Sequence, residues 1–209
     1  MKGKDLSEVF KKITTFVFDV DGVMTNCGVL ALESGETDLP AVGDWAAIDP
    51  RPTCDRAGLA AVLPRRTCLA RQDAGRATRA QVLAANVDVA FLVGALDAGR
   101  GFSLARMERA LALVRAGGAE AVAVLNKADL CDDIGGRVRE AQAAAPDVAV
   151  IAVSATEGWG VDELRPWLAA GRTGVLLGPS GVGKSALVNA LLGEARQATG
   201  AVREEDARG

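Results

Sequence analysis

The sequence feature that most constrains the fold is an eight-residue run with the pattern G-x-x-x-x-G-K-S. It spans residues 178–185, follows the apolar run Gly174–Leu177 and precedes the helical run Ala186–Leu192. Glycines in such a run let backbone N–H groups turn toward a phosphate, and the N-terminus of the following helix favours an anion. A strand, a glycine-rich loop and a helix in this order predict a phosphate-binding loop.

Two side chains of this loop carry the expected chemistry. Lys184 is predicted to reach the β- and γ-phosphates of a nucleotide, and the Ser185 hydroxyl is predicted to hold Mg²⁺. These two are therefore the candidate catalytic residues, and Ser185 is the candidate metal ligand. The predicted phosphate contacts are Gly178, Ser180, Gly181, Val182, Gly183, Lys184, Ser185 and Ala186.

Upstream of the loop, strand-like and helical runs alternate. Besides Gly174–Leu177, the predicted buried strands are Val87–Leu96, Ala119–Leu125 and Val148–Val153. The predicted helices between them and after them are Leu104–Ala116, Arg137–Ala145 and Val161–Ala169. Alternating strands and helices predict an α/β domain with a mostly parallel sheet, here a P-loop NTPase fold, whose ligand site lies at the carboxyl ends of the strands.

A second motif directly follows the strand that ends at Leu125. It reads Asn126-Lys127-Ala128-Asp129 and matches the N-K-x-D element of GTPases. The Asp129 carboxylate can accept hydrogen bonds from N1 and N2 of guanine together, and adenine offers no such donor pair, so adenine should be rejected strongly. Asn126 is expected to bridge to the base or to a neighbouring loop, and the Lys127 stem to cover the face of the ring.

Composition excludes several other chemistries. The 209 residues include four cysteines, none in a C-x-x-C pair, and no histidine, so no zinc site is expected and Ser-His-Asp or Cys-His catalysis is excluded.

No apolar run reaches the roughly 18 residues that a membrane helix needs. The N-terminal run mixes acids with bases and is a poor secretory signal. We therefore expect a cytoplasmic protein without a membrane partner.

The first 26 residues differ from the rest in composition and carry their own motif. The run Ile13–Val20 predicts a strand and leads into Asp19-Val20-Asp21-Gly22-Val23-Met24-Thr25, which resembles the first motif of the haloacid-dehalogenase phosphatases. That resemblance implies Asp19 as the nucleophile and Asp21 as the general acid beside Mg²⁺. The other residues of such a site have no convincing copy downstream, so residues 1–26 are interpreted as a fused segment. A Mg²⁺-dependent phosphatase is kept as an alternative function.

Residues 27–86 are predicted to form a small β-barrel. Short strand-like runs at Val29–Leu32, Trp45–Ile48 and Leu59–Leu63 are separated by glycine and proline, and an OB-fold fits the length. Although the net charge of the chain is −3, the segment between positions 51 and 80 contains seven arginines and only two acidic residues. A locally basic segment of this kind favours an RNA partner.

The order of the motifs points to one family. N-K-x-D precedes the phosphate loop by some fifty residues, which is the reverse of ordinary small GTPases and indicates a circular permutation. Three upstream runs resemble the OB domain of the ribosome small-subunit-dependent GTPase A family and its junction with the GTPase domain. They are Asp38-Leu-Pro-Ala-Val-Gly-Asp44-Trp45, Leu63-Pro-Arg65-Arg66-Thr67 with Arg71, and Ala84-Ala-Asn86-Val-Asp88.

This resemblance covers about Cys27 to Gly209 and implies a protein that binds GTP and GDP with Mg²⁺ and hydrolyses GTP. It implies a role in maturation of the small ribosomal subunit, with ribosomal RNA contacted by Arg65, Arg66 and Arg71. It also implies that Ser154-Ala155, directly after Val153, presents a backbone N–H to guanine O6. The domains would then be residues 1–26, 27–86 and 87–209.

In that family a threonine-containing switch, an Asp-x-Pro-Gly motif and a zinc module follow the phosphate loop, and this sequence shows no copy of them. We therefore expect an incomplete GTPase domain that keeps its guanine contacts, hydrolyses GTP poorly and binds GDP and GTP with similar affinity. A non-catalytic module that binds ribosomal RNA is the second alternative.

Overall fold

The structure is a computed structural model that describes residues 17–18, 41–49, 58–72, 80–97 and 102–193. Asp19, Asp21 and the predicted strand Val29–Leu32 lie outside the described residues. Along the part of the chain that is described, no helix has both the length and the apolar character that crossing a membrane requires.

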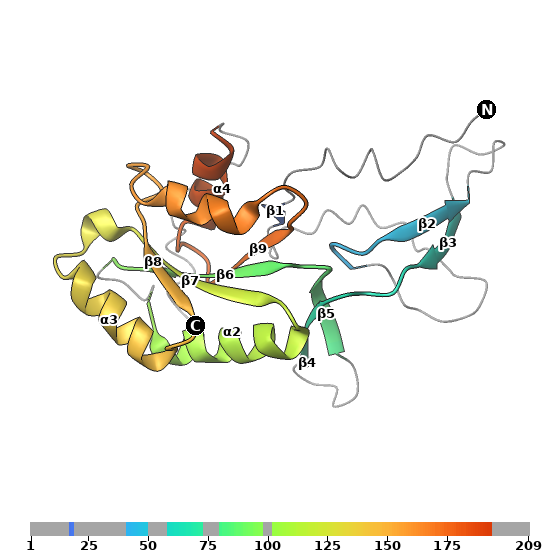
Figure 1. The fold of residues 1–209 in the computed structure, drawn as a ribbon, viewed down its shortest axis with the longest axis horizontal. Helices are drawn as coiled ribbons and strands as arrows, with labels where there is room; N and C mark the ends of the chain where they lie inside the picture. Colours follow the sequence, from blue (N-terminus) through green and yellow to red (C-terminus); the bar gives the residue numbers. More distant parts are fainter. Residues whose placement is uncertain (1–16, 19–40, 50–57, 73–79, 98–101, 194–209) are drawn as a thin grey trace.

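A parallel sheet organises the larger part of the molecule. Its strands are β6 (Val89–Ala95), β7 (Glu120–Asn126), β8 (Ala149–Ala152) and β9 (Gly174–Leu177), with the short β1 (Val17–Phe18) paired in parallel with β9 at one edge. The order across the sheet is β1-β9-β6-β7-β8 (Figure 1). The predicted α/β domain with a parallel sheet is confirmed, and each of its four predicted strands is found within two residues of its predicted ends.

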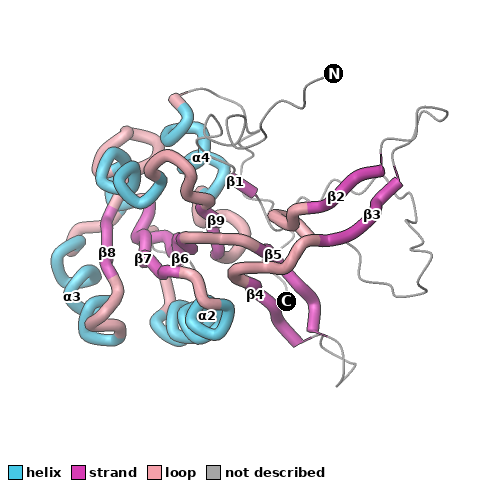
Figure 2. Tube along the Cα trace, turned by 45° about the vertical axis from the view of Figure 1, so that its right-hand side comes forward, coloured by secondary structure: helices cyan, strands magenta, loops and turns pink. Residues whose placement is uncertain are grey.

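Helices cover both faces of this sheet, which is why β6 and the middle of β7 are apolar on both faces. α2 (Leu104–Gly117) and α3 (Ile134–Ala144) pack on one face, while α4 (Lys184–Leu192) and the 3-10 helix Val161–Leu168 pack on the other (Figures 1 and 2). Alternate residues of one strand serve the two cores. Leu92 belongs to the core under α2, and its neighbour Phe91 belongs to the core under α4.

Two predicted helices differ from what the structure shows. The helix predicted from Arg137 begins three residues earlier, because the Asp133 carboxylate accepts a hydrogen bond of 2.8 Å from the Gly136 N–H and so caps the first turn. The helix predicted over Val161–Ala169 is a 3-10 helix instead. Pro166 lies inside it and has no N–H to donate, which disfavours a regular α-helical ladder.

The upstream part forms two antiparallel pairs. β2 (Ala46–Asp49) pairs with β3 (Gly58–Val62), and β4 (Cys68–Gln72) pairs with β5 (Ala80–Ala85). Among the described residues these pairs form two separate two-stranded sheets rather than one closed barrel. Sequence reasoning missed the β4–β5 pair, because neither of its strands, which read CLARQ and AQVLAA, alternates apolar and polar residues.

The β4–β5 pair packs directly on α2. Leu69 in β4 and Ala84 in β5 are buried in the same core as Met107 and Val114 of α2. The approach is close enough that a Cβ on Gly117 would lie 2.7 Å from the backbone carbonyl oxygen of Cys68. The pair and the α/β sheet therefore share one hydrophobic core.

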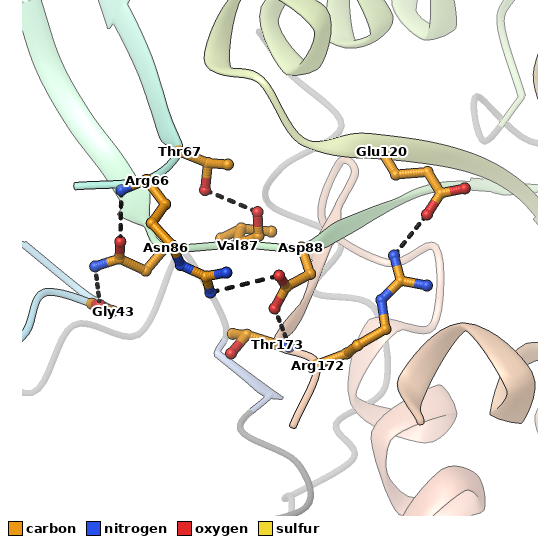
Figure 3. A network of polar contacts seen from close by, with 9 residues as sticks. All are labelled: Gly43, Arg66, Thr67, Asn86, Val87, Asp88, Glu120, Arg172 and Thr173. Carbon is orange, nitrogen blue, oxygen red and sulfur yellow. Dashed lines mark hydrogen bonds and ion pairs between the residues drawn. The ribbon is translucent and has the colours of Figure 1, made fainter. Parts of the chain in front are cut away.

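A network of polar contacts joins the upstream segments to the sheet (Figure 3). At its centre is Asn86, which is 4% exposed and has a φ of 54°. Its Oδ1 accepts a hydrogen bond of 2.8 Å from the Arg66 N–H, and its Nδ2 donates one of 3.0 Å to the Gly43 carbonyl. Near it in the sequence, Asp88 accepts a hydrogen bond of 2.7 Å from the N–H of Thr173, the residue just before β9.

Candidate functional site

The carboxyl ends of β9, β7 and β8 bring three sequence motifs together. The phosphate loop, residues 178–185, follows β9, the N-K-x-D residues begin at the end of β7, and Ser154-Ala155 follows β8. Because all the strands are parallel, these three loops emerge at the same edge of the sheet. The sequence separates the loops by up to 59 positions, and the topology makes them neighbours.

Asn126 links all three loops through its side chain. It is 2% exposed, and its Nδ2 donates a hydrogen bond of 2.8 Å to the Val182 carbonyl in the phosphate loop. Its Oδ1 accepts one of 3.1 Å from the Ala155 N–H in the loop after β8. One amide group therefore fixes the phosphate loop and the third motif relative to the end of β7.

Two glycines of the phosphate loop are required by close approaches. Gly183 has a φ of 93°, and a Cβ there would lie 2.3 Å from Nδ2 of Asn126. A Cβ on Gly178 would lie 2.3 Å from the carbonyl oxygen of Val93 in β6. The loop keeps its shape because no side chain occupies either position.

The chemical groups of the loop lie at the start of α4. Lys184 is the first residue of that helix, and its Nζ donates hydrogen bonds of 2.9 and 3.1 Å to the carbonyl oxygens of Gly178 and Pro179. Its ammonium group is thus held across the mouth of the loop. Ser185 lies in the same first turn and is partly buried, Ser180 and Gly181 are exposed, and Val182 is 1% exposed within the core.

The donor set fits Mg²⁺ bound together with a nucleotide. In the described part of the chain, no group of three His, Cys, Asp or Glu side chains could hold a metal by itself. The Ser185 hydroxyl offers a hard oxygen donor in the first turn of α4. Mg²⁺ usually keeps several waters and takes the remainder of its ligands from substrate phosphates and one or two protein oxygens.

The N-K-x-D residues form a tight turn with one strained position. Lys127 has a φ of 60° and a ψ of 38°, which is unusual for a residue with a side chain. Asp129 lies in the 3-10 helix Ala128–Leu130 and is exposed, so its carboxylate is accessible to a ligand. The Lys127 Nζ lies 2.6 Å from Oδ2 of Asp97, which follows β6.

Sequence reasoning missed Asp97. It stands outside every recognised motif, and only its place just after a predicted buried strand could have drawn attention to it.

The loop after β8 is fixed by its own hydrogen bonds. Ser154 is 1% exposed, its N–H donates a hydrogen bond of 2.9 Å to the Trp159 carbonyl, and its Oγ accepts one of 3.2 Å from the Glu157 N–H. The family resemblance assigns a backbone N–H of Ser154-Ala155 to guanine O6. In this structure the Ser154 N–H donates to Trp159 and the Ala155 N–H donates to Asn126, so contact of either N–H with a base would share or replace its present hydrogen bond.

The three arginines expected to contact RNA have different surroundings. Arg65 makes a bidentate ion pair with Asp44, with two contacts of 2.7 Å, and the Asp44 side chain is fully buried. Arg66 is 68% exposed and lies 3.4 Å from Asp88, and exposed Arg71 donates to Gln81 on the neighbouring strand. Arg66 and Arg71 therefore present accessible charge, whereas Arg65 is committed to a partner within the fold.

Asp44 is ionised over the whole physiological range. Burial alone raises the pKa of its carboxyl, but the hydrogen bonds from Arg65 and from the Ala41 N–H, with the charge of Arg65, hold that pKa below its usual value. The same pair raises the pKa of Arg65. The pair fixes the turn before β2 to the segment before β4.

A parallel α/β sheet with a phosphate loop, an N-K-x-D turn and a bridging asparagine at one edge defines the class of P-loop GTPases. Within that class, the model of the RsgA GTPase family matches residues 62–209. The match covers more than half of the chain, and the chain belongs to the RsgA GTPase family.

Individual relatives agree with this assignment. The chain is 49% identical over 170 residues to the small ribosomal subunit biogenesis GTPase RsgA of Opitutus terrae, covering 78% of the chain and 46% of that protein. It is 40% identical over 190 residues to the protein of the same name from Methanosarcina acetivorans, covering 91% of the chain and 51% of that protein. The chain thus spans about half the length of the curated relatives it matches.

A solved structure is similar as well. The crystal structure of YjeQ from Thermotoga maritima matches with a TM-score of 0.58 and 29% sequence identity, and the match covers 79% of this chain and 54% of that one.

Proposed function

We propose that this chain binds GDP and GTP at the edge formed by the ends of β7, β8 and β9, and that it acts in maturation of the small ribosomal subunit. The observation that carries the proposal is the Asn126 side chain, which ties the N-K-x-D turn to the phosphate loop at 2.8 Å and to Ala155 at 3.1 Å. This bridge assembles a base site and a phosphate site on one rigid framework, as a nucleotide requires.

In this proposal each part of the site has a separate task. Asp129 accepts hydrogen bonds from guanine N1 and N2, the N–H groups of the phosphate loop and the Lys184 ammonium bind the phosphates, and Ser185 holds Mg²⁺. Hydrolysis of GTP to GDP and phosphate would rest on Lys184 and on Mg²⁺, which stabilise the charge that develops on the transferred phosphoryl group. The order of the motifs supports a circularly permuted domain over residues 87–209.

Nucleotide selectivity tests the proposal directly. Fluorescent GDP should bind the 209-residue chain in the presence of Mg²⁺, and ATP should fail to compete. Asp129→Asn should weaken GDP binding by at least about 100-fold, since two hydrogen bonds to a charged acceptor are lost. The same variant should gain affinity for xanthosine diphosphate, because the asparagine amide can donate to the O2 that replaces the N2 amine of guanine.

A matched control is available three residues further along. Asp132 is also an exposed carboxylate just after β7, and Asp132→Asn should leave GDP affinity unchanged. Equal competition by ATP and GDP, or equal effects of the two substitutions, would refute the assignment of the base site.

The ribosomal partner is proposed from the exposed arginines together with family membership. The two antiparallel pairs of the upstream part support an OB-like unit over residues 27–86, with Arg66 and Arg71 contacting phosphates of ribosomal RNA. Arg66→Gln and Arg71→Gln should each weaken binding to purified small subunits and lower the slope of log K against log salt by about 0.7 to 0.9. Binding with an unchanged slope would exclude these side chains as phosphate contacts.

A further inference from the structure

We propose that Asp97 is a positioning residue of the guanine site, which holds the Lys127 side chain in one place before the base arrives. The inference rests on the proposed function, because it assigns the Lys127 stem to the face of the guanine ring. Asp97 itself touches neither base nor phosphate in this account. It acts through the lysine.

The pairing of β6 with β7 brings the two residues together. Ala95 and Asn126 are partners in the parallel register, and the Leu96 N–H donates a hydrogen bond of 2.7 Å to the Asn126 carbonyl. The residues that follow, Asp97 and Lys127, therefore leave the sheet side by side. Their charged groups meet at 2.6 Å.

This ion pair differs from the others on the α/β part in its surroundings. The Lys127 and Asp97 side chains are only 25% and 27% exposed. Arg115 and Asp147, which pair at 2.6 Å near the amino ends of the strands, are 51% and 68% exposed. An ion pair with little access to water is screened less by salt and by solvent. The Lys127 ammonium is thus held more firmly than a surface lysine.

The backbone of Lys127 is fixed as well. The neighbouring Asn126 side chain is anchored in two loops, and the Ala128 N–H donates a hydrogen bond of 3.0 Å to the Val153 carbonyl. The left-handed conformation of Lys127 is held between these two anchors. With its Cα fixed by the turn and its Nζ fixed by Asp97, the four-carbon stem is restrained at both ends.

Restraint at both ends matters because lysine is among the side chains that lose the most rotamer freedom when they are ordered. A stem that is already ordered loses little freedom when a ring packs against it, so more of the contact energy appears as affinity. Without Asp97 the stem must be ordered by the nucleotide itself. The expected result is weaker binding of guanine nucleotides with an intact fold.

The test uses the full 209-residue chain and fluorescent GDP. Asp97→Asn should weaken GDP binding by about 3- to 10-fold, the cost of immobilising one flexible side chain, and most of the change should appear as faster dissociation. Lys127→Met keeps the stem but loses the ammonium, so it should show a similar loss. In the Lys127→Met background, Asp97→Asn should have no further effect. Asp97→Glu should recover part of the affinity.

Asp147→Asn is the matched control, since it removes an ion pair of the same length far from the site, and GDP affinity should not change. Circular dichroism and the melting temperature of Asp97→Asn should match those of the unaltered chain. A loss below twofold for Asp97→Asn, or an equal loss in the Lys127→Met background, would overturn the inference while leaving the nucleotide site intact. Failure of the unaltered chain to bind GDP would overturn the proposed function and this inference together.

Discussion

Replacement of Asn86 tests whether the polar network between the upstream segments and the sheet stabilises the fold. Asn86→Ala removes the hydrogen bonds to the Arg66 N–H and to the Gly43 carbonyl, at 2.8 and 3.0 Å. The residue is 4% exposed, so both partners lose a bond in a place with little water. Leaving a buried polar group unsatisfied costs about 1 to 3 kcal/mol. Both hydrogen bonds are only partly buried, so each loss should lie near about 1 to 2 kcal/mol, and the two together should cost about 2 to 4 kcal/mol.

The backbone adds a second contribution that can be separated from the first. Asn86 has a φ of 54°, a conformation that asparagine tolerates and alanine disfavours by about 1 kcal/mol or more. Asn86→Gly removes the same two hydrogen bonds without this strain. We therefore expect a loss of about 3 to 5 kcal/mol for alanine and about 2 to 4 kcal/mol for glycine.

Urea unfolding measures both losses. With a slope of about 1 to 3 kcal/mol per molar urea, a loss of 3 kcal/mol moves the midpoint by about 1 to 3 M. Trp45 lies two residues after Gly43 of the network, whereas Trp159 and Trp167 lie in the α/β part. A variant with phenylalanine at positions 159 and 167 therefore reports on the upstream segment alone. Fluorescence of this variant and of the chain with all three tryptophans should both show the lower midpoint, because hydrogen bonds from Ala85 and Asn86 tie the turn before Trp45 to the β4–β5 pair, which shares its core with the sheet.

The control is another side-chain amide in the same region. Gln81 hydrogen-bonds Arg71 at an exposed position of the β4–β5 pair, and Gln81→Ala should change the free energy of unfolding by less than about 0.5 kcal/mol. A change of this small size for Asn86→Ala would refute the reasoning, since it would mean that the network contributes nothing to stability.

Three further outcomes are expected. Gly183→Ala should abolish GDP binding, because its Cβ would lie 2.3 Å from Nδ2 of Asn126 at a φ of 93°; fluorescent GDP titration measures this, and retained affinity would contradict it. Because the pKa of Asp44 is lowered in the folded chain, its pair with Arg65 stabilises the fold above about pH 4, and this stabilisation is lost as the pH falls through the folded pKa. Urea midpoints should show a smaller acid dependence in Asp44→Asn, and an identical pH profile would contradict the assignment. Gly117→Ala should lower the free energy of unfolding by about 1 to 3 kcal/mol, because the new Cβ would crowd β4, and an unchanged urea midpoint would show that the pair does not pack on α2.

The four sheet strands and the positions of their motifs could be predicted from the sequence because local chemistry determines them. Buried parallel strands must be apolar on both faces, and β6, β7 and β9 stand out as apolar runs for that reason. The phosphate loop is recognisable because only glycine fits the backbone conformation at Gly183 and the close approach at Gly178. The N-K-x-D motif is also visible in the sequence, and its position before the phosphate loop indicates the family.

The partners of the individual side chains were decided by the tertiary structure alone. Arg65 and Arg66 are neighbours with the same chemistry, yet the fold gives one a buried carboxylate and leaves the other exposed. Asp97 carries no motif, and it becomes a partner of Lys127 only because the register of β6 and β7 places it there. Composition and spacing describe what a residue can do, while the sheet order decides which group it meets.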